Sequence, residues 1–395
     1  MAKAKIRSIT PANTADITGK IVTWARKRLG KSQEEIAKQI GRRFRAAHIE
    51  DWEKERTKPP FDKAKKLATA LHIPFGFLFL TEIPTHDVKV PDRRTVGNVS
   101  VDTFSPEFLD QLRNLLLKQE WYRDYVSEQG KKPLSFVGRF NTSSPVDDVA
   151  ADIRKELGIT HDFRVVARTW EDFLSNLMAS AESAGILMIR SGVVGSASRR
   201  HLSVKEFRGF AHSDPIAPLI FINGRDSTSA QVFTLAHELA HLWIGKGGVS
   251  NPNPKHRSTD EHNLIERFCN KVAAEVLVPR TEFLRQWLDS VSIEQNVYTL
   301  VRYFRVSEHV ILRQAFEHDK LSRNEYEKRI EVLEDRFRAA QSGGNFFINV
   351  RVRNSRTLAV SVLDAIHEKR VSLRDAATLL GCKVPTLKTI ATELR

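Results

Sequence analysis

The residues with the clearest chemical capacity are His237-Glu238-Leu239-Ala240-His241. On a helix, positions i and i+4 lie one turn apart on the same face, so both imidazoles can bind one metal ion from one side. Glu238 then lies about 100° round the helix, beside the open coordination position. There its carboxylate can take a proton from water and pass it to the leaving amine. The motif predicts a zinc peptidase site with Glu238 as catalytic base; a helix with two ordinary histidines is the alternative.

A catalytic zinc usually has three protein ligands and one open position. The extended motif with a third histidine is excluded, because Ile244 and Gly247 stand where it requires Gly and His. A carboxylate on a later helix is therefore expected, and Glu266 is the preferred candidate. Asn270 shares its helical face and is expected to orient a histidine through the far ring nitrogen. The rival ligands are Glu275, Asp260, Glu261 and His262.

The segment around this motif mixes helices and strands. Apolar residues before and after the histidines predict that their helix is buried in a core. Pro218–Asn223 reads as a strand directly before it, and Ile186–Ile189 as an earlier strand. The strand at 219–222 either offers an edge to an extended substrate or simply builds the sheet behind the helix, or does both. An oxyanion donor is also needed, and the sequence does not separate the candidates Arg225, Tyr298, Tyr303 and the nearby histidines.

A different chemistry is expected near the N-terminus. Ser32-Gln33-Glu34-Glu35 matches a capping box that starts a helix, and Gly41 ends that helix. A second helix follows and ends at Trp52-Glu53, which gives a helix-turn-helix pattern. Basic and polar residues gather there and are candidates for DNA contacts. The candidates are Gln33, Arg42, Arg43, Arg45 and His48, with Lys54, Arg56 and Lys58 beyond them. A small helical bundle that docks proteins is the alternative.

Charge supports a polyanion partner for this segment. The chain of 395 residues has a net charge of +14, and residues 1–80 alone hold 18 Lys+Arg against 8 Asp+Glu. Such a concentration points first to nucleic acid. The sequence has no long apolar run and no secretory signal at its start, so no membrane contact is expected. Cys269 and Cys382 are far apart and form no metal or redox pair, which fits a reducing cytoplasm.

The chain length and the positions of Pro, Gly and non-periodic segments predict four regions. They are a helix-turn-helix unit at 1–82, a linker and helical connector at 83–145, a metallopeptidase domain at 146–320 and a helical C-terminal region at 321–395. The tail Val371–Leu394 repeats a helix–Gly–helix pattern with few basic residues, so docking or homodimer formation is the preferred role for it. The expected class is α+β and predominantly helical.

Several segments resemble the ImmA/IrrE family of bacterial and phage metallopeptidases. The resemblance rests on Phe233–His241 after the strand Phe221–Asn223, on Glu266–Pro279, and on Leu300–Ser307. The N-terminal unit is similar to the Xre/Cro/C1 helix-turn-helix group, although its stretch from Gly41 to Trp52 is longer than usual there. Together these resemblances cover most of the chain.

The resemblance carries its own expectations. It implies a zincin-like domain with a small sheet, in which Glu266 completes the zinc site formed by His237 and His241. It implies cleavage of a partner repressor or antitoxin. That cleavage would relieve repression of genes for stress response, mobile-element transfer or phage defence. Two other functions stay open: a DNA-binding regulator whose zinc site is structural or sensory, and an antitoxin-like or toxin-like binding protein.

Overall fold

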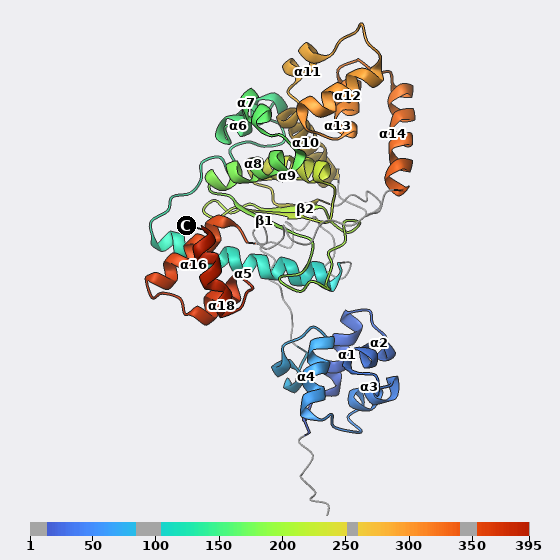
Figure 1. Cartoon of the computed structure of the whole chain (residues 1–395), viewed down its shortest axis with the longest axis vertical. Coiled ribbons are helices and arrows are strands. Elements are labelled where there is room, and N and C mark those ends of the chain that lie inside the picture. The colour runs from blue at the N-terminus through green and yellow to red at the C-terminus, as the bar shows by residue number, and fades with distance from the viewer. Residues whose placement is uncertain (1–13, 84–103, 251–259, 340–353, 395) are drawn as a thin grey trace, which may run out of the picture. The chain divides into compact units, whose positions relative to one another are not determined.

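The computed structural model describes residues 14–83, 104–250, 260–339 and 354–394. It divides into two compact units, Met1–Val88 and Lys89–Arg395. Residues 84–103, which belong to the linker and helical connector expected at 83–145, lie outside the described residues. The predicted class is confirmed, since the protein is mostly helical with one small sheet (Figure 1).

The N-terminal unit is a bundle of short helices. The capping box at Ser32 forms as predicted: its backbone N–H donates to Glu35 Oε2 over 2.7 Å, and its hydroxyl accepts from the Glu35 backbone N–H. Ile36 and Trp52 are buried in the centre of the bundle. The elements are α1 (Gly19–Arg28), α2 (Gln33–Ile40), α3 (Ala46–Glu53), α4 (Phe61–Ala70) and the 3-10 helix η1 (Phe75–Phe79).

A mixed four-stranded sheet organises the second unit, in the order β1-β3-β2-β4. Its strands are β1 (Leu187–Ser191), β2 (Gly209–His212), β3 (Leu219–Asn223) and β4 (Gly248–Ser250). Strand β3 is parallel to β1 and antiparallel to β2, and β2 is antiparallel to β4. Because β3 has a partner on each side, it cannot offer an edge to a substrate. Of the alternatives left open by the sequence, the structure supports the one in which this strand only builds the sheet behind the helix.

Helices cover both faces of this sheet (Figure 1). Ile220 and Ile222 of β3 belong to a core shared with α8 (Trp170–Ser183) and α9 (Thr228–Trp243). Leu219 and Phe221 face the other way, into a core shared with α5 (Pro106–Glu128). Two covered faces explain why these strands read as continuous apolar runs instead of alternating ones.

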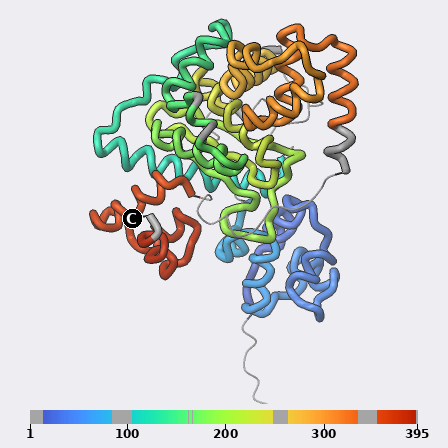
Figure 2. The backbone as a smooth tube through the Cα atoms, turned by 45° about the horizontal axis from the view of Figure 1, so that its top comes forward, coloured from blue at the N-terminus to red at the C-terminus, as the bar shows by residue number. Residues whose placement is uncertain are grey.

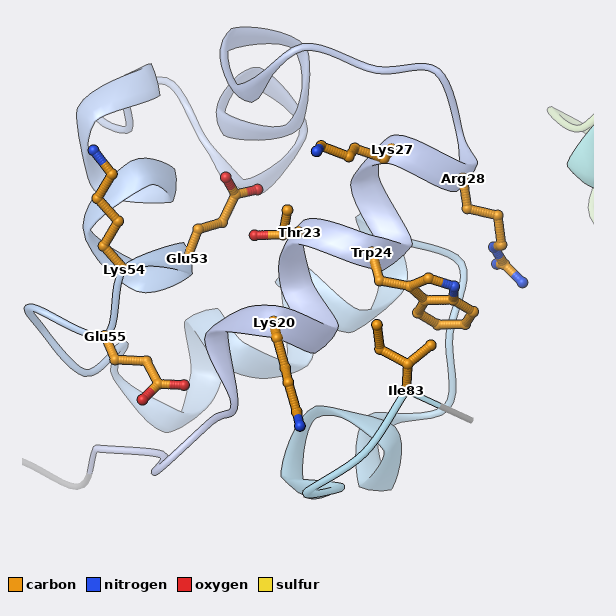
Figure 3. Close-up of a pocket in the computed structure, with 9 residues that line it drawn as sticks. All are labelled: Lys20, Thr23, Trp24, Lys27, Arg28, Glu53, Lys54, Glu55 and Ile83. Atoms are coloured by element: carbon orange, nitrogen blue, oxygen red, sulfur yellow. The ribbon is translucent and has the colours of Figure 1, made fainter. Parts of the chain in front are cut away.

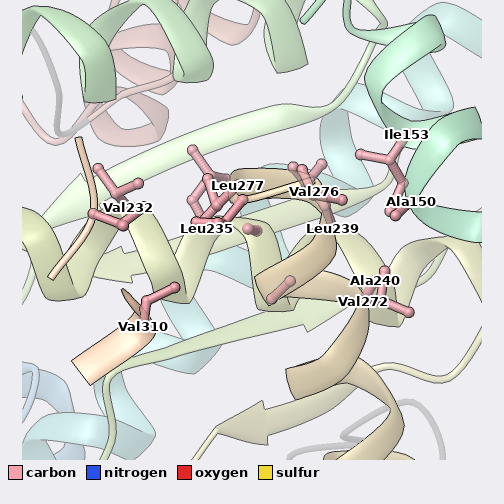
Figure 4. Packing of buried hydrophobic residues seen from close by; sticks show 14 of the residues in the cluster. Ala150, Ile153, Val232, Leu235, Leu239, Ala240, Val272, Val276, Leu277 and Val310 are labelled. Carbon is pink, nitrogen blue, oxygen red and sulfur yellow. The ribbon is translucent and has the colours of Figure 1, made fainter. Parts of the chain in front are cut away.

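The first core extends away from the sheet into a helical layer. There α10 (Asp260–Leu277) packs against α9 and against α6 (Val146–Glu156), as Figure 4 shows for Leu235, Leu239 and Val276. Further helices complete this layer. They are α7 (His161–Val166), α11 (Arg280–Gln286), α12 (Ile293–Phe304), α13 (Glu308–Glu317) and α14 (Arg323–Ala339).

The C-terminal helices dock on the same unit. They are α16 (Arg356–His367), α17 (Leu373–Leu379) and α18 (Val384–Leu394). Figures 1 and 2 show them, in red, beside α5 and away from the orange α11–α14 layer. Glu182 of α8 accepts from the Ser355 hydroxyl over 2.6 Å and from the Arg356 backbone N–H over 2.8 Å, so it caps α16. The helix–Gly–helix tail also contributes buried residues to a core within the chain, and homodimer formation stays a prediction.

Two strands were not predicted from the sequence. Strands β2 and β4 are four and three residues long and carry two glycines between them, so they lack a strand signature. No helix among the described residues is long and apolar enough to cross a membrane.

The docking of α16 can be tested by substitution. Val362 is fully buried in the core that α16 shares with α5 and β1, whereas Val360 on the same helix is 37% exposed. We expect Val362→Ala to lower the free energy of unfolding by about 1–2 kcal/mol, because two methyl groups leave a packed core. Val360→Ala is the matched control and should change it by less than about 0.5 kcal/mol. Urea unfolding followed by circular dichroism measures both; equal effects would contradict the docking.

Candidate metal centre and helix-turn-helix surface

Helix α9 carries the histidine motif through the centre of the second unit. It begins at Thr228, where the hydroxyl of the N-cap residue Ser227 accepts from the Ala230 backbone N–H. From Gln231 to Trp243 nearly every side chain is buried, because strands β2 and β3, α8 and α10 all contact the helix. The predicted buried helix is confirmed, and the motif lies in a protected interior.

Three of the predicted ligand residues meet at one point. The Nε2 atoms of His237 and His241 lie 3.0 Å apart. Glu266 on α10 reaches both, with Oε2 3.2 Å from His237 Nε2 and Oε1 3.2 Å from His241 Nε2. Among the described residues, these three form a group whose ligand atoms all lie within 4.8 Å of one another. Glu266 is the most accessible of the three, with its side chain 24% exposed, so the group opens to solvent on the α10 side.

The outer nitrogens of both imidazoles are held by oxygen acceptors. His237 Nδ1 lies 3.0 Å from Asn270 Oδ1, and His241 Nδ1 lies 2.8 Å from the carbonyl oxygen of Lys246. Because these oxygens only accept, each neutral ring carries its proton on Nδ1 and presents the lone pair of Nε2 to the centre. This is the tautomer that a metal ion at the centre requires.

Electrostatics in the metal-free cluster show what a cation would replace. Burial opposes the charged form of Glu266, but hydrogen bonds with His237 and His241 outweigh it and lower its pKa below the ordinary value. Burial also opposes a charged His241, but Cys269 and Glu266 raise the pKa of this histidine well above its ordinary value. The cluster thus retains a proton beside a carboxylate, and a metal ion would compete with that proton.

This donor set fits a metal ion. Two neutral imidazole nitrogens and one carboxylate are a common ligand set of catalytic zinc. The rival Glu275 lies elsewhere, since its carboxylate oxygens accept from the Arg280 backbone N–H at 3.1 and 3.2 Å and so cap α11. The side chains of the remaining rivals, residues 260–262, are not among those the structure describes.

Glu238 directly follows His237 on α9, and so adjoins the group of His237, His241 and Glu266, named here the metal-binding group for the role proposed below. Glu238 is fully buried and lies against strand β2. A Cβ atom added to Gly209 would lie 3.1 Å from Glu238 Oε1, 2.6 Å from Thr234 Cγ2 and 2.9 Å from the carbonyl oxygen of Phe221. Only a glycine leaves room for the carboxylate at this point. Sequence reasoning missed Gly209, because nothing local marks a glycine in a four-residue strand as part of a site.

The end of α9 is fixed by a loop from earlier in the chain. Trp243 stacks on Phe136 with ring centroids 4.4 Å apart, and its Nε1–H donates to Asp152 over 2.7 Å. The Gly138 backbone N–H donates to the Leu242 carbonyl oxygen over 2.9 Å. These contacts hold the turn that presents the Lys246 carbonyl to His241. The sequence gives no signal for such a backbone contact.

The candidate oxyanion donors are engaged elsewhere. The Tyr303 hydroxyl donates to Glu282 over 2.6 Å, and the Arg302 guanidinium lies 3.7 Å from the Tyr298 ring centroid. Arg225 packs against Gly192 in the loop before α9. These contacts assign the oxyanion role to none of the three.

The helix-turn-helix unit holds Gln33 in an internal network. Its side-chain amide donates to Glu53 over 2.7 Å, and Arg26 pairs with the same carboxylate over 2.6 Å. Figure 3 shows Glu53 directed towards α1 across a surface hollow that Lys20 and Lys27 also line. This network fixes the end of α3 against α1 and α2, and leaves the amide oxygen and the second amide N–H of Gln33 for further hydrogen bonds.

The other DNA-contact candidates lie on the turn and the start of α3. Arg42, Arg43, Arg45 and His48 are all exposed. Within the described part of the chain, none of these three arginines forms an ion pair. By contrast, the basic residues beyond α3 are paired with carboxylates. The pairs are Lys54 with Glu50 at 2.6 Å, Arg56 with Asp51 at 3.1 Å, and Lys58 with Asp16 at 2.8 Å.

Comparison with known families agrees with both parts of this architecture. Residues 181–316 match the peptidase M78 family, described as the IrrE N-terminal-like domain, and residues 22–78 match a helix-turn-helix family. A search of curated proteins found no match. The chain therefore contains an IrrE N-terminal-like peptidase domain and a helix-turn-helix domain, as the resemblance implied. The peptidase family is a metallopeptidase family, and His237, His241 and Glu266 all lie inside the matched segment.

The close approach at Gly209 can be tested. We expect Gly209→Ala to lower the free energy of unfolding by about 1–3 kcal/mol, because the added methyl overpacks Thr234 and the β3 backbone. Urea unfolding measures the change. Gly76→Ala is the control: nothing lies within 4 Å of its added Cβ, so a neutral or slightly stabilising effect is expected. A Gly209→Ala protein as stable as the unmodified chain would show that β2 does not constrain this region.

Proposed function

We propose that this chain is a zinc-dependent endopeptidase that hydrolyses a specific regulatory protein, a repressor or an antitoxin, and so controls transcription. The observation that carries the proposal is the convergence of His237, His241 and Glu266 beside a buried glutamate that is not itself one of the three. A structural zinc site is normally closed by four protein ligands and needs no carboxylate beside it. The helix-turn-helix domain in the same chain supports a regulatory substrate.

In this proposal the two histidines and Glu266 hold the zinc ion. When bound, zinc supplies Lewis acidity, which lowers the pKa of water and polarises the peptide carbonyl. Glu238 takes the proton of the attacking water and gives it to the leaving amine nitrogen. Asn270 and the Lys246 carbonyl act as positioning groups, because they fix the ring tautomers of His237 and His241. Because Glu238 is buried, its carboxylate is kept out of bulk water and holds one orientation in the site.

The substrate is proposed to bind along β4. Among the described strands, β4 and β1 are the two ends of the sheet, and β4 directly follows the turn that ends α9. An extended peptide can add to such an edge through backbone hydrogen bonds. This assigns to β4 the role that the interior strand β3 cannot perform.

Ligand and base roles can be separated by substitution. We expect His237→Ala and Glu266→Gln to lose zinc after dialysis, while Glu238→Gln keeps zinc and loses cleavage by about 10²–10⁴-fold, because only proton transfer is removed. Metal content by mass spectrometry and cleavage of a quenched fluorescent peptide library are the two measurements. Glu275→Gln is the matched control, since it changes a carboxylate on α10 that caps α11; it should keep both zinc and activity. If Glu238→Gln cleaves at the unmodified rate, the peptidase proposal fails and a structural or sensory metal remains.

The helix-turn-helix domain is proposed to bind DNA through the turn between α2 and α3. Its exposed arginines lack carboxylate partners among the described residues, so they can bind phosphates without breaking internal ion pairs. Gln33 and His48 lie at the starts of α2 and α3 and are proposed as further contacts, to backbone or base. If the regulatory protein that is cleaved is itself bound to DNA, DNA binding by this domain would bring the peptidase to it.

Two triple variants test the DNA surface. The first variant changes Arg42, Arg43 and Arg45 together to Ala and should bind a random duplex more weakly. The slope of log binding constant against log salt concentration should fall by roughly 0.9 for each phosphate that the variant no longer binds. The second variant changes Lys54, Arg56 and Lys58 together to Ala and removes the same positive charge. Because these side chains are already paired with carboxylates of the chain, we expect a smaller loss of DNA binding. Fluorescence anisotropy at several salt concentrations measures both. Equally weakened binding in the two variants would show that only net charge matters.

A further inference from the structure

A basic ridge runs along α10 directly beside the metal-binding group. Asn263, Arg267 and Lys271 follow an i, i+4, i+8 spacing, so their side chains form one column on the helix. Glu266 and Asn270 form the adjacent column, one position back in sequence. Arg267 and Lys271 are both exposed, whereas Phe268 and Val272 on the far side of the helix are buried. The cations therefore border the metal-binding group on its solvent side.

Lys246 adds a third cation to this border. Its carbonyl oxygen holds His241, and its side chain is exposed at the end of α9. Over the described residues, Lys246, Arg267 and Lys271 form no ion pair. Arginines elsewhere in the same unit do, such as Arg139 with Asp152 at 2.7 Å and Arg164 with Glu282 at 2.7 Å.

Overall charge does not explain these unpaired cations. Residues 146–320 carry nearly equal numbers of acidic and basic side chains, and the excess charge of the chain is concentrated in residues 1–80. Cations in a near-neutral domain are expected to find internal partners or to serve an external one. Because these cations lie beside the metal-binding group, we favour an external partner. That partner would be a ligand that extends from the metal-binding group across α10.

We propose that Arg267 and Lys271, together with Lys246, select a substrate segment that carries Asp or Glu near the cleaved bond. This inference rests on the proposed peptidase function and names its substrate class. Neighbouring columns of a helix are about 5–6 Å apart, and Lys271 lies about 7.5 Å along the axis from Glu266. An extended peptide advances about 3.3 Å per residue. The acidic residues therefore stand about two or three positions from the cleaved bond.

The test uses three quenched fluorescent peptides of equal length with the same apolar centre. The centre is flanked by Glu in one, Gln in the second and Lys in the third. Binding to the zinc-loaded Glu238→Gln chain is measured by anisotropy at low and high salt, and cleavage is measured with the unmodified chain. At low salt we expect the Glu peptide to bind roughly tenfold more tightly than the Lys peptide, because two exposed charge pairs replace two repulsions. The preference should shrink at high salt.

Charge reversal then assigns the preference to the ridge. Arg267→Glu with Lys271→Glu should favour the Lys peptide and leave zinc content unchanged. Lys155→Glu with Lys205→Glu makes the same change in net charge at exposed positions outside the site and should keep the preference for the Glu peptide. Equal binding of the Glu and Lys peptides, or a preference that survives reversal of the ridge, overturns the inference.

Binding and cleavage fail independently. If the Glu peptide binds best and the ridge controls that preference, but the unmodified chain cleaves none of the three, the ridge stands as an acidic-peptide site and the peptidase proposal falls. If cleavage occurs at equal rates for the Glu and Lys peptides, the peptidase proposal stands and the selective ridge is refuted.

Discussion

The packing of α10 against α9 is the interaction on which the candidate site depends. Leu235 and Leu239 of α9 and Val276 of α10 lie in the buried layer between the helices (Figure 4). That apolar contact fixes the register of α10, and the register brings Glu266 opposite the histidine pair. Small residues such as Ala240 and Ala273 are also buried there, which permits a close approach of the two backbones. A shift of one residue along α10 would turn Glu266 through about 100° and away from the site.

Burying a polar motif in such a helix has an energetic cost, and the surrounding structure offsets it. An imidazole or a carboxylate removed from water requires hydrogen-bond partners. Asn270 and the Lys246 carbonyl supply acceptors for the two histidines, and Gly209 leaves space for Glu238. These partners come from α10, from the turn after α9 and from β2. The polar centre therefore requires three separate elements of the same domain to be in place before it can bind a metal ion.

This dispersion explains how far the sequence could predict the site. The buried helix that carries His237 and the capping box at Ser32 form as expected from periodicity and capping, because those signals are local. Helical spacing and the family resemblance both favour Glu266, and the structure separates it from Glu275, which caps α11. Strand β2 could not be predicted, because a short strand that contains glycine depends on tertiary packing. The contact of the Lys246 carbonyl with His241 could not be predicted either, because a backbone contact depends on the same packing. The interior position of β3 depends on strand order, which local sequence does not encode.

Joining a DNA-binding domain to a peptidase domain changes the problem of finding a substrate. A protein tethered near its target acts at an effective concentration set by the connecting chain, often in the millimolar range for short flexible links. Phosphate contacts by Arg42, Arg43 and Arg45 would hold the chain on DNA without choosing a sequence. A repressor bound to the same DNA would then meet the peptidase at a concentration far above that in free solution. If the proposed DNA surface and peptidase site act together, weak selection by the basic ridge would be sufficient, because proximity would supply most of the encounter and the ridge would only have to orient the segment that is cut.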